Sequence, residues 1–165
     1  MHSLYKFLFI SCCTSAALLS GCGRDESSDS LKVPRLMMEA RGVDYGSLNG
    51  TVINLPVSGT PISLRKEPLI NEFEILNVEL VQVDLGLALM VQISETAARE
   101  LYRASVTNNG SRVVLTVNGT AIGARRIDGA IADGRFYTFV ELPHSELPQL
   151  VLDLKKTIAD IQAKK

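Results

Sequence analysis

The feature that most constrains the fold is a strand, a two-residue turn and a second strand in residues 112–127, RVVLTVNGTAIGARRI. Both flanking runs are rich in β-branched and apolar residues, which favour strands. Asn118 and Gly119 between them tolerate the positive φ angles that a two-residue hairpin turn requires. We therefore expect these two strands to pair antiparallel.

Further strands are predicted on both sides of this hairpin. Residues 72–94 carry the strongest strand pattern, and Gly86 divides them into two strands. Strict alternation in this run would place Ile75 on one face and Leu76 and Val78 on the other. The other predicted strands are shorter and lie in residues 34–43, 51–57, 60–66 and 135–142.

Two segments have the apolar spacing of helices. The first, residues 95–108, follows Ser94, a good N-cap residue, and ends before Gly110. The second, residues 145–162, carries an apolar stripe. From Leu87 onward the predicted order is β-α-β-β-β-α, so the expected fold class is α+β, with a mainly antiparallel sheet and two principal helices packed on it. The stripe consists of Leu147, Leu150, Val151, Leu154, Ile158 and Ile161.

The start of the chain has the pattern of an exported and lipid-modified protein. Lys6 precedes an uncharged apolar run at 7–19, which is shorter than the roughly 20 residues that span a bilayer and is typical of a secretory signal peptide. Residues 19–22, Leu-Ser-Gly-Cys, resemble the lipobox of bacterial lipoproteins. That resemblance implies lipidation of Cys22 and removal of residues 1–21. The alternative is an ordinary signal peptide that contains a cysteine.

Residues 23–30, GRDESSDS, are charged and serine-rich, which predicts a flexible tether. The expected organisation is a signal peptide at 1–21, a lipidated cysteine with its tether at 22–33, and a single periplasmic α+β domain at 34–165. In bacterial lipoproteins Gly23, rather than Asp, after the cysteine implies transfer to the outer membrane. The expected location is therefore the periplasmic face of the outer membrane.

Charge and cysteine content exclude several classes of site. Without its first 21 residues the chain has 16 basic and 18 acidic residues, which is close to neutral and predicts no nucleic-acid partner. Cys22 would then be the one cysteine, so neither a disulfide nor a cysteine metal site nor a thiol nucleophile is expected. The sequence also has no dinucleotide fingerprint and no phosphate-binding loop. No metal and no cofactor are therefore predicted.

Isolated polar residues give weak signals for chemistry. His144 has no nucleophile motif around it and is expected at the surface. Asp128 and Asp133 each precede glycine, which turns explain. Glu72 and Glu74 are expected to be solvated strand residues. We assign no catalytic residue from the sequence.

The pair Arg125 and Arg126 gives the best indication of a binding site. Adjacent strand residues face opposite ways, so one arginine is expected to be exposed and the other to need a carboxylate or carbonyl partner. The hairpin at 113–127 would also offer a strand edge. An extended segment could add to that edge through backbone hydrogen bonds, with one arginine meeting a carboxylate.

Residues 87–162 resemble the head subdomain of the first periplasmic region of SecD, from the SecDF protein-export complex. Arg125 stands where that pattern usually has proline. The resemblance implies a mobile, non-catalytic head that contacts polypeptide. It does not imply export activity, because this chain lacks the transmembrane helices on which proton coupling in SecDF depends. The resemblance is carried by residues 93–127 and 131–154, including Val-Asn-Gly at 117–119 and Ile-Gly-Ala at 122–124.

Two functions are consistent with these features. The first is a membrane-anchored lipoprotein that acts as a non-catalytic interaction module for an unidentified protein or peptide of the cell envelope. The alternative is a small envelope enzyme that uses carboxylates on the sheet, such as Glu79 or Asp84. A deep polar pocket would favour the enzyme, and a flat or grooved sheet face would favour the interaction module.

Overall fold

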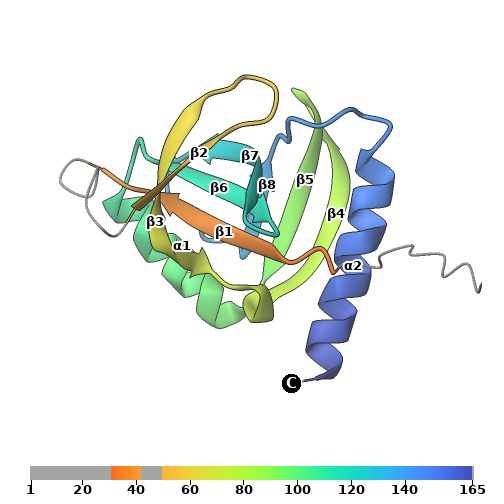
Figure 1. Cartoon of the computed structure of the whole chain (residues 1–165). Helices are drawn as coiled ribbons and strands as arrows, with labels where there is room; N and C mark the ends of the chain where they lie inside the picture. Colours follow the sequence, from red (N-terminus) through yellow and green to blue (C-terminus); the bar gives the residue numbers. More distant parts are fainter. Residues whose placement is uncertain (1–30, 42–49, 165) are drawn as a thin grey trace, which may run out of the picture. The chain divides into compact units, whose positions relative to one another are not determined.

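The computed structural model describes residues 31–41 and 50–164 (Figure 1). The predicted signal peptide, Cys22 and residues 23–30 lie outside the described residues. The fold is α+β, as predicted, and the order β-α-β-β-β-α from β5 to α2 is confirmed. The elements are β1 (Pro34–Glu39), β2 (Gly50–Asn54), β3 (Pro61–Ile70), the short 3-10 helix η2 (Glu72–Glu74), β4 (Ile75–Val83), β5 (Gly86–Ile93), α1 (Glu95–Thr107), β6 (Arg112–Val117), β7 (Thr120–Arg126), β8 (Arg135–Thr138) and α2 (Leu147–Ala163).

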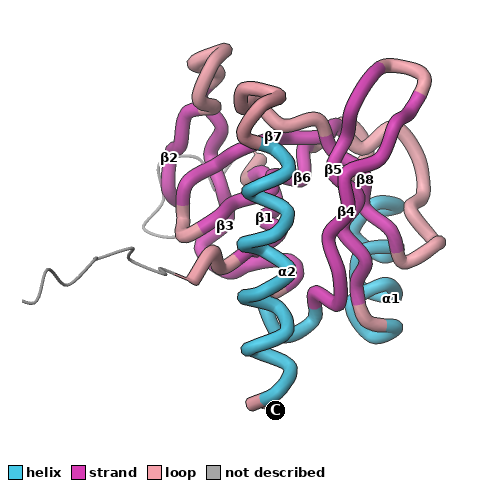
Figure 2. Tube along the Cα trace, turned by 90° about the vertical axis from the view of Figure 1, so that its right-hand side faces the viewer, coloured by secondary structure: helices cyan, strands magenta, loops and turns pink. Residues whose placement is uncertain are grey.

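The strands form two sheets, and all the strand pairs described are antiparallel. One sheet has the order β2-β3-β1-β6-β7 and the other β4-β5-β8. The C-terminal half is thus divided between the two sheets. In Figure 2, β2 and β3 lie to one side of α2 and β4, β5 and β8 to the other. The helix α2 packs on β4 and η2, and α1 contacts β3.

The main core takes side chains from both sheets and both helices. On β6 the side chains of Val113 and Leu115 face this core, whereas Val114 faces a smaller apolar cluster on the other side of the sheet. The five-stranded sheet therefore carries buried apolar residues on both faces. The completely buried members of the main core include Leu36, Ile70, Ile75, Val78, Leu89, Val91, Leu101, Phe136 and Leu154.

The two sheets are joined where β7 passes the segment that follows β8. Gly123 forms an isolated antiparallel bridge with Val140, and the Glu141 N–H donates to the Ile122 carbonyl at 2.7 Å. A Cβ built on Gly123 would lie 2.3 Å from the carbonyl oxygen of Phe139. Only glycine permits such a close approach of two backbones.

The prediction of strict alternation along β4 was wrong. The pairing of β4 with β5 shifts by one residue between Ile75 and Asn77, which is a β-bulge. The bulge turns Ile75 and Val78 to the same side, and both are completely buried, while Leu76 is 45% exposed. The strand therefore supplies the core with residues that a regular strand would place on opposite faces.

The local turn and cap signals were correct. Asn118 and Gly119 have φ angles of 51° and 81° in the turn between β6 and β7. The Ser94 Oγ accepts a hydrogen bond from the Ala97 N–H at 3.2 Å and so caps α1. Across residues 31–41 and 50–164, no helix is long and apolar enough to cross a membrane.

The segment before β1 is held by the C-terminal half of the domain. The Lys32 N–H donates to the Thr157 Oγ1 on α2 at 2.9 Å. The Val33 N–H donates to the Asn118 Oδ1 at 2.8 Å, and the Asn118 N–H donates to the Val33 carbonyl at 3.0 Å. The chain therefore enters the domain between α2 and the turn of the β6-β7 hairpin.

Candidate functional site

The structure places Arg125 and Arg126 on different surfaces. The Arg125 side chain is 34% exposed, and its Nη2 lies 3.7 Å from the Oδ1 of Asp128. Arg126 is exposed, and its guanidinium lies beside Gly110, in the loop that follows α1. These two arginines therefore belong to different environments, and of the two, Arg125 has the carboxylate neighbour.

The hairpin offers less free strand edge than the sequence suggests. The strand β6 lies between β1 and β7, so its edges are both used. On the outer edge of β7, Gly123 pairs with Val140 and the Ile122 carbonyl accepts the Glu141 N–H. The middle of that edge is thus covered, and a peptide cannot add along the whole of β7.

Two further arginines, which the sequence did not connect with Arg126, reach the same loop. Arg41 follows β1, and its Nη2 donates to the backbone carbonyls of Asn108 and Asn109. Arg65 lies in β3, and its Nη2 donates to the Asn108 Oδ1 at 3.3 Å. Carbonyls at the C-terminal end of a helix carry partial negative charge, which favours cations at the end of α1.

Gly110 shows how close the guanidinium groups of Arg41 and Arg126 come to each other. A Cβ built on Gly110 would lie 3.2 Å from the Nη2 of Arg41 and 3.5 Å from the Nη2 of Arg126. Both groups therefore sit side by side over this glycine, whose φ is +83°. We call Arg41, Arg65 and Arg126 the arginine cluster.

The arginine cluster has no ion pair with a carboxylate in the part of the chain that the structure describes. The nearby carboxylate of Glu39 is engaged by Arg112, whose Nη2 lies 2.7 Å from the Glu39 Oε1 and whose N–H donates to the Oε2 at 2.7 Å. Burial alone would raise the pKa of Glu39, but the hydrogen bonds and charge of Arg112, aided by the charge of Arg41, hold that pKa below its ordinary value. The cluster thus retains positive charge and unused N–H donors.

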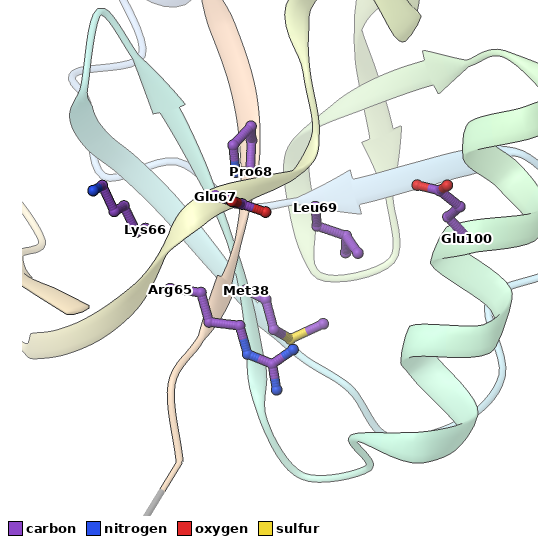
Figure 3. Close-up of a pocket in the computed structure, with 7 residues that line it drawn as sticks. All are labelled: Met38, Arg65, Lys66, Glu67, Pro68, Leu69 and Glu100. Atoms are coloured by element: carbon purple, nitrogen blue, oxygen red, sulfur yellow. The ribbon is translucent and has the colours of Figure 1, made fainter. Parts of the chain in front are cut away.

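A hollow of about 740 Å³ lies beside the arginine cluster and shares Arg65 with it (Figure 3). The pairing of β1 with β3 shifts between Met37 opposite Pro68 and Glu39 opposite Leu64, so β3 bulges at this point. Figure 3 shows the hollow between this bulged strand and α1. The lining residues are Met38, Arg65, Lys66, Glu67, Pro68, Leu69 and Glu100.

The carboxylates singled out in the sequence lie at separate places. Glu79 stands in the middle of β4, and its Oε1 accepts a hydrogen bond from the Asn77 Nδ2 at 2.9 Å. Asp84 is exposed in the turn between β4 and β5. Glu72 forms an ion pair with Arg35, with 2.6 Å between Oε2 and Nε. None of these carboxylates lines the hollow beside the arginine cluster.

The remaining polar candidates occupy loops. His144 is exposed in the segment before α2. The Asp133 Oδ1 accepts a hydrogen bond from the Arg135 N–H at 3.2 Å, which is the turn role that the sequence suggested. Neither residue lines the hollow.

No family model matches the sequence, and no curated protein matches it. Solved structures of SecDF do match. A crystal structure of SecDF in the super-membrane-facing form has a TM-score of 0.56 and 14% identity, over 75% of this chain and 18% of that chain. A second structure, of SecDF as a membrane component that enhances protein export, has a TM-score of 0.55 and 16% identity, over 75% of this chain and 62% of that chain.

These matches establish the fold. The domain resembles a SecD domain, as predicted, and the structural similarity extends over more of the chain than residues 87–162. The chain spans less than two thirds of the length of either of these two SecDF chains.

Proposed function

We propose that this chain is a membrane-anchored bacterial lipoprotein whose domain binds a protein or peptide of the cell envelope and performs no chemistry. The observation that carries the proposal is the arginine cluster, which has no ion pair with any carboxylate of residues 31–41 and 50–164 and lies beside an open hollow. The SecDF-like fold supports polypeptide as the class of partner, since one of the similar proteins is described as enhancing protein export. Arg126 is the residue through which we expect the domain to hold its partner.

The anchor can be tested by intact-mass measurement of the protein purified from membranes. We expect a chain that begins at Cys22 and carries the mass of attached acyl chains, because two or more chains are needed for stable anchoring. The Cys22→Ser variant is the control and should lack the added mass. An unmodified Cys22, or a chain that retains residues 1–21, would contradict the anchor.

Partner capture can be tested by photo-crosslinking in living cells, with a photoreactive residue in place of Lys66 at the hollow. We expect crosslinked envelope protein or peptide, reduced severalfold by Arg126→Ala, because that change removes one guanidinium from the cluster. Arg125→Ala is the matched control, since Arg125 lies beside Asp128 and outside the cluster.

Two results would contradict this proposal. One is capture that Arg126→Ala and Arg125→Ala reduce equally, with both variants folded. The other is turnover of an envelope substrate by the purified chain, which would favour the alternative of an enzyme.

A further inference from the structure

We propose that the arginine cluster binds carboxylates of an acidic, extended polypeptide segment, and that the adjoining hollow takes an apolar side chain of the same segment. This inference rests on the proposed function and names the chemistry of the partner. It uses the cluster, formed by Arg41, Arg65 and Arg126, together with the hollow that Arg65 also lines.

The positive charge of the arginine cluster favours an anionic ligand. Like charges this close repel each other, and an anion placed among them relieves that repulsion. Arg41 and Arg65 donate to a few oxygens of the loop after α1, and these contacts fix the direction of their side chains without neutralising them. Arg126 has no carboxylate partner in the described residues. A planar guanidinium with free N–H donors is suited to bidentate binding of a carboxylate.

The lining of the hollow favours a polypeptide over an anionic membrane surface. Met38, Pro68 and Leu69 offer apolar contact, whereas Glu67 and Glu100 place negative charge on the same lining. These two carboxylates would repel lipid phosphates brought against the hollow. A polypeptide can instead present its carboxylates to the cluster and an apolar side chain to the hollow.

The spacing of side chains in an extended peptide suits the arginine cluster. In an extended chain, alternate side chains point to the same side and are about 7 Å apart. Arg41 and Arg126 stand side by side over Gly110, and Arg65 reaches the same loop through Asn108. Two acidic residues at alternate positions could therefore each meet a guanidinium, and an apolar side chain farther along the segment could enter the hollow that Arg65 also lines.

The test measures binding of a fluorescent, end-blocked decapeptide that repeats Asp-Ser-Asp-Ser-Leu, so that two Asp and one Leu share a face when it is extended. The protein is the mature full-length chain in phosphatidylcholine nanodiscs without detergent. A second peptide carries Asn in place of every Asp. We expect the Asp peptide to bind at least about tenfold more tightly than the Asn peptide, and its affinity to fall as salt is raised. Phosphatidylglycerol vesicles form a third arm and should compete weakly.

Substitutions test whether the arginine cluster is the binding site of the Asp peptide. Arg126→Ala and Arg65→Ala should each weaken binding of the Asp peptide by about tenfold, and Arg126→Lys should restore only part of it because lysine lacks the planar fork. Arg125→Ala and Arg135→Ala are controls, since neither residue belongs to the cluster. Thermal melts show whether each variant is folded, and Arg126→Lys keeps the test valid if an alanine variant is not.

Equal binding of the Asp and Asn peptides would overturn the inference, as would equal losses in the cluster variants and the controls. Arg126-dependent binding to vesicles that exceeds binding to the Asp peptide would also overturn it, in favour of a lipid surface. If the Asp peptide fails to bind while Arg126-dependent crosslinking in cells persists, the acidic chemistry is wrong and the proposed function stands. If the crosslinking itself does not depend on Arg126, the proposed function fails.

Discussion

Replacing Gly123 by alanine is expected to lower the free energy of unfolding by about 3 kcal/mol. The added Cβ would lie 2.3 Å from the Phe139 carbonyl oxygen and 3.1 Å from the Val140 Cα. These are backbone atoms, and the Glu141 N–H holds their segment to Ile122, so the segment cannot withdraw without breaking the junction of the two sheets.

Urea unfolding of the full-length chain measures this effect. Gly129→Ala is a matched control, because a Cβ at Gly129 meets nothing within 4 Å and its φ lies outside the left-handed region. The control should change stability by less than about 0.5 kcal/mol. Equal midpoints for the two variants would show that the sheets are not joined at Gly123 as described.

Leu154→Ala should destabilise the domain by about 2–5 kcal/mol. Leu154 is completely buried in the main core, on the helix α2 that packs against β4. Truncation leaves a cavity at a place where both sheets contribute side chains. Leu152, two residues earlier on the same helix, is 61% exposed, so Leu152→Ala should cost little. Unfolding curves that coincide for the two variants would argue against the packing of α2.

The local elements of this fold were predictable because each has a signal confined to a few residues. The Asn118-Gly119 pair marks a turn that can be recognised without knowing the rest of the chain. Ser94 marks the start of α1 in the same way. The apolar stripe of α2 indicates its buried face, and Leu147, Val151, Leu154 and Ile158 are indeed buried.

The division into two sheets was not predictable in this way. It depends on β1 pairing with both β3 and β6, which are far from each other in the sequence. The shifts in register have weak local signals. Pro68 in a strand is one, since proline is confined to edges and bulges, and β3 does bulge between Leu64 and Pro68.

The candidate site was found only in part. Two adjacent arginines drew attention to Arg126, but the neighbours that give it a role come from distant segments, Arg41 from the residues after β1 and Arg65 from β3. The loop around Gly110 was expected only to end a helix, whereas it also gathers these side chains. Three arginines that lie far apart in the sequence form no motif that could be recognised before the fold is known.

The position of β1 has a mechanical consequence. Lys32 and Val33 come directly before it in the chain, and Arg41 follows its C-terminal end. Tension between the proposed anchor at Cys22 and the proposed ligand at Arg41 would therefore run along β1. This strand is bonded to β3 on one edge and to β6 on the other. Because both attachment points lie at the ends of β1, its extended covalent backbone would carry that tension, and the hydrogen bonds to β3 and β6 would be largely spared.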